Sequence, residues 1–131
     1  MTINSDKKSI LIVDDTPETL SLFEQALGNL DCTLYTASSG QEAVDMTIKN
    51  DGFDIILLDI KMPGLNGYRV AELIREHQKF KPIPIVFITA SHTDERDVAR
   101  GYEVGAVDYL TKPVDLEILL NKVQSLLVVN K

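Results

Sequence analysis

Four apolar residues run directly into a carboxylate in Ile55-Ile56-Leu57-Leu58-Asp59, and a loop-forming segment, Ile60-Lys61-Met62-Pro63-Gly64-Leu65-Asn66-Gly67, follows them. A run this short, bounded by Asp and then by Pro and Gly, predicts a strand that is buried on both faces. The loop opens at the carboxyl end of this strand, which is the end where ligands bind in open α/β sheets. We therefore expect Asp59 to lie at the edge of a sheet and to face whatever binds there.

Four more apolar runs predict strands of the same kind, and amphipathic segments between them predict helices. This alternation, with short loops, predicts an α/β fold: a five-stranded parallel sheet with helices on both faces, joined by right-handed crossovers. The predicted strands cover residues 10–13, 32–37, 55–59, 85–88 and 107–110. The predicted helices begin near residues 17, 39, 67, 94 and 115.

Polar residues mark the starts of several predicted helices. Thr16 offers a capping hydroxyl directly before a proline, and Asp115 occupies the capping position of the last helix. Ser39 and Glu42 are spaced as in a capping box. The apolar spacing of the second helix places three residues on its inward face: Ala43, Val44 and Ile48.

Length and composition limit the function classes. The chain has 131 residues, so we expect one domain over residues 9–131 after a flexible N-terminus of residues 1–8. The net charge is −7 and no basic stripe is present, which argues against direct nucleic-acid binding. The single cysteine, Cys32, excludes an internal disulfide, and no apolar run is long enough to span a membrane. The cytoplasm is the expected compartment.

Polar side chains follow four of the predicted strands, where each strand ends. Asp14 and Asp15 follow the first strand, Asp59 the third, Thr89 the fourth and Lys112 the fifth. Because all carboxyl ends of a parallel sheet meet at one edge, these groups should converge. Three converging carboxylates raise one another's pKa unless a cation joins them, and oxygen ligands with room for water favour Mg²⁺.

A lysine and a hydroxyl beside such a carboxylate can neutralise and orient a transferring phosphoryl group. The chemistry that this arrangement predicts is attack of Asp59 on phosphorus, which gives an aspartyl phosphate. Each residue also has an ordinary alternative: the Asp14-Asp15 pair as a solvated turn, Asp59 as a turn residue, Thr89 as a strand residue and Lys112 as a surface lysine.

Over residues 9–128, the sequence with these strand-end residues resembles a response-regulator receiver domain of bacterial two-component signalling. The matching pieces are Asp14-Asp15, the block from Asp59 to Pro63 with Gly67, Thr89-Ala90, and Lys112-Pro113. Each piece alone is a weak signal, whereas all of them in order at strand ends are a strong one. The resemblance implies a flavodoxin-like (βα)5 fold with strand order 2-1-3-4-5.

The resemblance also implies a role for each matched residue. Asp59 would accept a phosphoryl group from a phosphohistidine on a sensor histidine kinase or phosphotransfer protein. Asp15, Asp59 and the backbone carbonyl of Lys61 would ligate Mg²⁺ directly, while Asp14 would act mainly through water. Thr89, the amide of Ala90 and Lys112 would hold phosphoryl oxygens. The bond between Lys112 and Pro113 would be cis.

A conformational switch is implied as well. Thr89 would move toward the phosphoryl group, and the side chain of Tyr109 would turn inward, although an aromatic residue in a strand is as often simply packed. The face formed by residues 94–105, 107–110 and the last helix would change shape to control an output partner or a fused output domain. The same face pairs two copies in many relatives, so a homodimer is a further expectation.

Two other functions compete with this one. The first is an aspartyl-nucleophile phosphatase of the haloacid-dehalogenase type, which needs a second carboxylate two residues after the nucleophile, where this chain has Lys61. The second is a nucleotide-binding module, but no glycine-rich phosphate loop follows the first strand. We therefore expect no turnover of an outside substrate, only self-catalysed phosphorylation and dephosphorylation.

Overall fold

The computed structural model of the chain describes residues 7–49, 53–77, 83–89 and 106–129. One parallel sheet lies at its centre, with the strand order β2-β1-β3-β4-β5, which confirms the predicted fold class and order. The strands are β1 (Lys8–Val13), β2 (Cys32–Ala37), β3 (Ile55–Asp59), β4 (Ile85–Thr89) and β5 (Ala106–Thr111).

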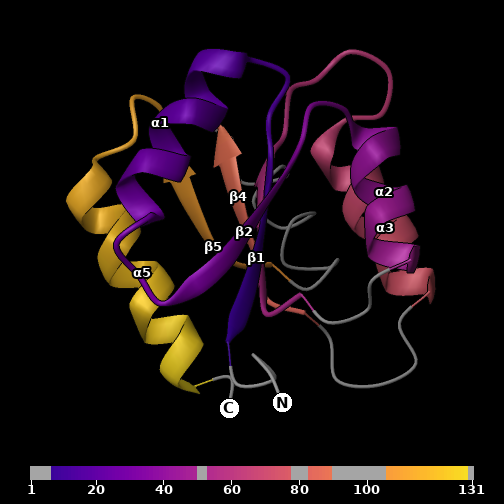
Figure 1. The fold of residues 1–131 in the computed structure, drawn as a ribbon. Coiled ribbons are helices and arrows are strands. Elements are labelled where there is room, and N and C mark those ends of the chain that lie inside the picture. Colours follow the sequence, from indigo (N-terminus) through magenta and orange to yellow (C-terminus); the bar gives the residue numbers. More distant parts are fainter. Residues whose placement is uncertain (1–6, 50–52, 78–82, 90–105, 130–131) are drawn as a thin grey trace.

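Helices cover both faces of this sheet, as Figure 1 shows: α1 and α5 lie on one face, and α2 and α3 lie side by side on the other. The helices of the described part are α1 (Pro17–Leu27), α2 (Gly40–Lys49), α3 (Gly67–His77) and α5 (Leu116–Val129). The helix predicted to begin near residue 94 lies outside the described residues. None of the described helices has the length and hydrophobicity that crossing a bilayer requires.

The central strand β3 is buried on both faces, as the unbroken run of apolar residues predicts. Ile56 and Leu58 pack in the core beneath α2 and α3, whereas Ile55 and Leu57 pack in the core beneath α1 and α5. Adjacent residues of a strand point to opposite faces, so β3 contributes to both cores. Its terminal residue, Asp59, is consequently held in a fixed position at the edge of the sheet.

Two predicted capping arrangements are present in the structure. Asp115 Oδ1 accepts hydrogen bonds from the amides of Glu117 (2.9 Å) and Ile118 (3.3 Å) at the start of α5. At the start of α2, Ser39 Oγ accepts from the Glu42 amide at 3.1 Å. The Glu42 carboxylate accepts from the preceding Ser38 amide at 2.7 Å, so the capping box is displaced by one residue.

Two local predictions were wrong. Thr16 makes no side-chain capping bond, although its backbone carbonyl accepts from the amides of Thr19 and Leu20 at the start of α1. Ile48 does not face the core: its side chain is 49% exposed, and the buried position of that turn belongs to Thr47. The Thr47 hydroxyl donates to the Ala43 carbonyl at 2.8 Å, so the buried oxygen is paired within the helix.

Replacing Asp115 with alanine should lower the free energy of unfolding by about 1 kcal/mol, because two amides at the start of α5 lose their acceptor. Urea unfolding monitored by circular dichroism measures this difference. Gln124→Ala is the matched control, since Gln124 is exposed in the middle of the same helix and caps nothing. Equal stability of the two variants would contradict the capping role.

Candidate functional site

The polar residues predicted to converge come from the carboxyl ends of four strands, at the top of the sheet in Figure 1. Asp14 and Asp15 directly follow β1, Asp59 ends β3, Thr89 ends β4 and Lys112 directly follows β5. Strand register brings them level, since Asp59 pairs with Ile88 and Thr89 pairs with Thr111. The fold thus places residues that are up to 98 positions apart in the sequence at one edge.

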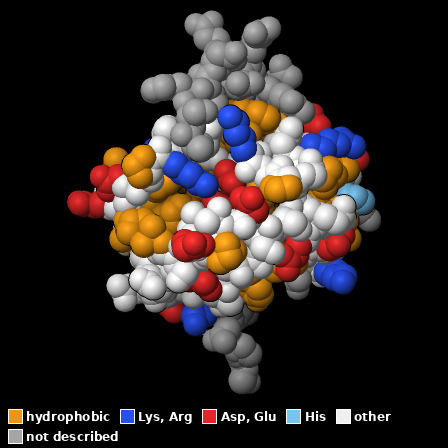
Figure 2. All heavy atoms as spheres, turned by 90° about the horizontal axis from the view of Figure 1, so that it is seen from above, with side chains coloured by type: hydrophobic (Ala, Val, Ile, Leu, Met, Phe, Trp, Pro, Cys, Tyr) orange, Lys and Arg blue, Asp and Glu red, His pale blue; other side chains and the backbone are white. Residues whose placement is uncertain are grey.

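Three carboxylates form the centre of this edge. Asp14, Asp15 and Asp59 each offer an oxygen, and these oxygens all lie within 4.8 Å of one another. Asp14 is 1% exposed and Asp59 is 3% exposed, whereas Asp15 is open to solvent. In Figure 2, which looks down on this edge, acidic and basic side chains lie next to one another near the middle of the face. A ligand from solvent therefore meets Asp15 before the two buried carboxylates.

Lys112 supplies positive charge to the buried pair. Its Nζ lies 2.9 Å from Asp14 Oδ2 and 3.8 Å from Asp59 Oδ1. Its backbone amide donates to the Thr89 carbonyl at 2.7 Å, which fixes the lysine against the end of β4. The peptide bond between Lys112 and Pro113 is cis, as the resemblance implied.

The backbone amide and both carboxylate oxygens of Asp14 make hydrogen bonds. Its amide donates to the Ala37 carbonyl at 3.1 Å, and its Oδ1 accepts from the Thr16 amide at 2.9 Å. Its other carboxylate oxygen accepts from Lys112. Both oxygens of this buried carboxylate therefore have a donor, which is the condition for keeping it charged away from water.

The negative charge of Asp59 is less fully offset by neighbouring donors than that of Asp14. The pKa of Asp59 is raised from 3.8 to about 6. Burial is the largest cause, and the negative charge of Asp14 is the next, with a smaller contribution from Asp15. Lys112 and the backbone amide of Lys61, which donates to the Asp59 carboxylate, oppose the shift. Asp59 is thus the group at this edge whose charge is most in need of a cation.

The loop after Asp59 packs too closely to admit a side chain at its end. The Gly67 amide donates to the Ile60 carbonyl at 2.7 Å. A Cβ on Gly67 would lie 2.6 Å from the Asp59 carbonyl oxygen and 2.8 Å from Ile60 Cα. This close approach holds the start of α3 against the end of β3. Lys61, in the same loop, is exposed.

The remaining predicted residues lie around this centre or outside the described part. Thr89 is 3% exposed at the end of β4. Ala90, predicted to hold a phosphoryl oxygen through its amide, lies outside the described residues. Tyr109 is half-buried on β5, and its ring lies against the ring of Phe87. Its hydroxyl lies 3.3 Å from the hydroxyl of Tyr68, a contact that the sequence analysis missed.

The donor set fits a hard divalent cation. Carboxylate oxygens dominate it, one carboxylate is open to solvent, and no described His or Cys belongs to the cluster. Zinc prefers nitrogen and sulfur ligands, whereas Mg²⁺ takes one or two carboxylates and keeps several waters. The pKa of Asp59 is raised by its burial and by the neighbouring carboxylates, and a bound cation would offset both effects.

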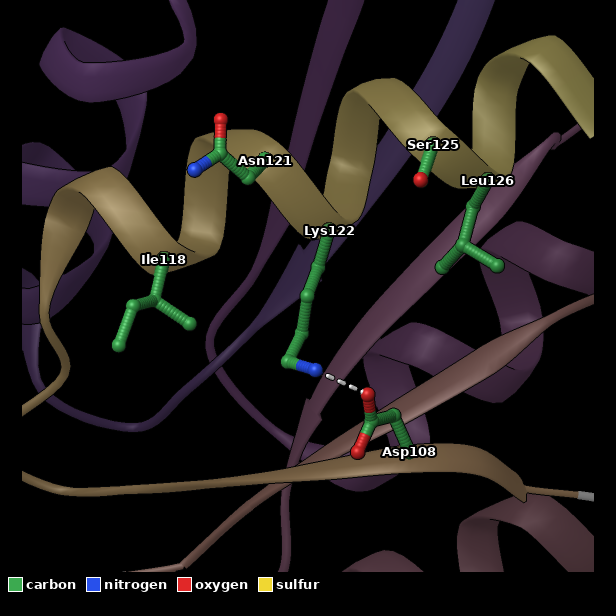
Figure 3. Close-up of a pocket in the computed structure, with 6 residues that line it drawn as sticks. All are labelled: Asp108, Ile118, Asn121, Lys122, Ser125 and Leu126. Carbon is green, nitrogen blue, oxygen red and sulfur yellow. Dashed lines mark hydrogen bonds and ion pairs between the residues drawn. The ribbon is translucent and has the colours of Figure 1, made fainter.

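A hollow of about 380 Å³ lies between β5 and α5, and none of Asp14, Asp15 and Asp59 lines it. Figure 3 shows the Lys122 side chain reaching from α5 across this hollow to an ion pair with Asp108 on β5. Ile118 lines the same hollow and is 48% exposed. The hollow lacks the cluster of carboxylates, so the acidic edge is the better candidate for chemistry.

Residues 10–124 match the response regulator receiver domain. The chain is 41% identical over 118 residues to the response regulator PleD of Caulobacter vibrioides (89% of this chain, 25% of the relative). It is 35% identical over 116 residues to the sensor histidine kinase CheAY of Helicobacter pylori (88% of this chain, 14% of the relative).

The chain thus spans only a quarter or less of these two relatives. Among solved structures, chemotaxis protein CheY4 of Vibrio cholerae superimposes with a TM-score of 0.83 at 28% identity. That match covers 92% of this chain and 98% of the other.

Proposed function

Because this chain belongs to the response regulator receiver domain family of two-component signalling, we propose that it is a phosphorylation-controlled module with Asp59 as its phosphoryl acceptor. One observation carries the proposal: a buried carboxylate at a strand end lies beside two further carboxylates and a lysine ammonium group. The raised pKa of Asp59 supports the same assignment, since strongly perturbed pKa values cluster at functional sites.

The proposed step is a direct transfer. A carboxylate oxygen of Asp59 attacks phosphorus, a new oxygen–phosphorus bond forms, and the bond from phosphorus to the donor nitrogen breaks. The electron pair of that bond stays with the imidazole of the donor. Lys112, whose Nζ is 3.8 Å from Asp59, offsets charge on the phosphoryl oxygens, and the Thr89 hydroxyl and the Ala90 amide hold two of them.

A divalent cation belongs to this proposal. Mg²⁺, when bound, supplies positive charge that offsets the phosphoryl oxygens and the clustered carboxylates. The residues that would hold it are Asp15, Asp59 and the backbone carbonyl of Lys61, with Asp14 acting through water. Asp14 suits the indirect role, because Thr16 and Lys112 already engage both of its oxygens.

Membership of the receiver domain family also suggests the phosphoryl donor and the output partner of this chain. The proposed donor is a sensor histidine kinase or a phosphotransfer protein in the cytoplasm, and the receiver domain is proposed to cover residues 9–131. The output is a partner protein or a fused output domain, read through the surface that includes β5 and α5, on which a homodimer can also form. PleD and CheAY, of which this chain spans 25% and 14%, support the fused arrangement.

Incubation with acetyl phosphate and Mg²⁺, followed by intact-mass measurement, tests the proposal. We expect one phosphoryl adduct per chain, its loss on treatment with hydroxylamine, and no adduct in EDTA. p-Nitrophenyl phosphate added to the same sample should release no steady stream of phosphate, since no outside substrate is turned over. No adduct with acetyl phosphate, together with no spectral response to beryllofluoride, would overturn the proposal.

The exposed Lys61 side chain should affect the lifetime of the phosphoryl group. Lys61 lies two residues after Asp59 and is exposed. We propose that its ammonium group reaches the bound phosphoryl group, so Lys61→Met should change the rate of dephosphorylation by several-fold. The decay of the mass adduct after removal of acetyl phosphate measures this rate. Lys49→Met removes an equally exposed lysine at the end of α2 and should leave the lifetime unchanged. Identical lifetimes in all three proteins would refute the effect.

A further inference from the structure

Three aromatic rings, each on a different element, pack in a row from α3 through β4 to β5. Tyr68, in the first turn of α3, packs edge-on against Phe87 of β4 with a centroid distance of 5.0 Å and an interplanar angle of 61°. Phe87 in turn lies against Tyr109 of β5 at 5.5 Å and 37°. Phe87 is fully buried and pairs with Tyr109 in the strand register, so it gives the two tyrosines a fixed surface.

The two outer rings of this row, Tyr68 and Tyr109, also contact each other through their hydroxyls. The hydroxyl oxygens of Tyr68 and Tyr109 lie 3.3 Å apart, and either can donate the hydrogen bond. This distance is longer than the usual 2.7–2.8 Å for hydroxyl pairs, so the bond is a weak one. With the Tyr109 ring against Phe87, the two hydroxyls are close enough to share this bond. A rotation of the ring to solvent would carry the Tyr109 hydroxyl away from Tyr68, so the contact favours the orientation in which the ring lies inward.

Tyr68 is itself placed by the loop that leaves Asp59. Gly67, the residue before it, is packed directly against the end of β3, with its amide bonded to the Ile60 carbonyl. The Tyr68 side chain is 5% exposed, so its ring has little freedom to follow Tyr109 outward. Tyr68 is therefore linked through Gly67 to the backbone of Asp59 and Ile60.

We propose that Tyr68 is a positioning residue for Tyr109, whose side chain it retains in the inward orientation through the hydroxyl contact and the shared Phe87 surface. This inference rests on the proposed function, which makes Tyr109 part of the phosphorylation switch, and it adds the group that sets the resting balance of that switch. A contact made in one orientation and lost in the other shifts the population toward the first. A weak hydrogen bond shifts such a ratio by about two- to fivefold.

Tyr68→Phe is the discriminating variant, because it removes the hydroxyl and keeps the ring that packs on Phe87. The chain contains four tyrosines, so spectra of protein labelled at the tyrosine rings are simple, and Tyr109→Phe assigns the Tyr109 signal. The readouts are the Tyr109 ring shift and its nuclear Overhauser effect to the Phe87 ring, recorded in Mg²⁺ before and after beryllofluoride. Tyr35→Phe is the control, since Tyr35 is 39% exposed on β2 and packs on Phe53 instead.

We expect Tyr68→Phe to weaken the contact between Tyr109 and Phe87 in the resting protein and to lower the inward-to-outward ratio by about two- to fivefold. Beryllofluoride should then produce a larger change at Tyr109 in this variant than in the parent. An unchanged resting signal of Tyr109 in a folded Tyr68→Phe protein, or the same change in Tyr35→Phe, would overturn the proposal. If beryllofluoride had no effect on any of these proteins and acetyl phosphate gave no adduct, the proposed function would fail, while the resting spectra would still decide the role of Tyr68.

The unfolding free energies of the same variants provide a second test of the contact between Tyr68 and Tyr109. In a double-mutant cycle, Tyr68→Phe should destabilise the parent more than it destabilises Tyr109→Phe, because the contact is already lost in the latter. Equal effects in both backgrounds would show that the Tyr68 hydroxyl acts elsewhere and would overturn the proposal.

Discussion

Asp59→Asn should abolish the phosphoryl adduct completely and, in metal-free solution at pH 7, should make the protein more stable. The first effect follows because the amide removes the proposed nucleophile. The second follows because the pKa of Asp59 is raised from 3.8 to about 6, so the folded protein holds the charged form at a cost of up to about 3 kcal/mol. Asparagine fills the same space without that charge.

The pH dependence has a definite sign. The pKa of Asp59 is higher in the folded than in the unfolded protein, so protonation of this group favours the folded state. Its contribution is fully present below about pH 4 and is lost as the pH rises through about 6. In EDTA, the stability of the parent should therefore fall relative to Asp59→Asn across this interval and then level off.

Urea unfolding in EDTA between pH 4 and pH 8 measures this difference. Asp31→Asn, which neutralises an exposed carboxylate just before β2, is the matched control and should track the parent at all pH values. Mg²⁺ should then restore stability to the parent and much less to Asp59→Asn, because the variant loses one of the proposed ligands. A gap between parent and variant that does not change with pH would show that the charge of Asp59 is not the cause.

Gly67→Ala should lower the free energy of unfolding by about 3 kcal/mol or more, which is at the upper end for an overpacked site. The added Cβ would lie 2.6 Å from the Asp59 carbonyl oxygen and 2.8 Å from Ile60 Cα. Both are backbone atoms of the central strand and its first loop residue, so neither can move aside as a flexible side chain would. Relief requires α3 to shift away from the sheet, which also disturbs the loop that carries the Lys61 amide.

Gly64→Ala is the control within the same loop. Gly64 has φ of +80°, but nothing lies within 4 Å of its virtual Cβ, so only the backbone strain of about 1 kcal/mol is expected. Urea unfolding of both variants separates the two causes, and acetyl phosphate labelling should be reduced much more in Gly67→Ala. A loss in Gly67→Ala no larger than that in Gly64→Ala would contradict the steric explanation.

The boundaries of the strands were largely predictable because they depend on local composition. The predicted strands at residues 32–37 and 55–59 match β2 and β3, and the other three are extended by one or two residues. The register of a helix face was less predictable. Ile48 and Thr47 are neighbours on α2, and a small rotation of the helix about its axis decides which of them is buried.

The alternation of strands and helices follows from the residue pattern alone, and so does the edge at which Asp14, Asp59 and Lys112 meet. Apolar runs and terminal polar residues are local features, and the direction of parallel strands converts them into a shared location. The hydrogen-bond and ion-pair partners at this edge depend instead on packing in three dimensions. Lys112 lies nearer to Asp14 than to Asp59, and Asp14 also takes the Thr16 amide, which the sequence does not indicate.

The contact between Tyr68 and Tyr109, 41 residues apart, likewise appears only in three dimensions. Which donor meets which acceptor depends on distances of a few tenths of an ångström, because hydrogen-bond strength falls steeply with distance and angle. Those distances are set by how each helix docks on the sheet, as the approach of Gly67 to the end of β3 sets the position of Tyr68. Strand order is therefore encoded in local patterns, whereas the partners of individual polar atoms are fixed by packing.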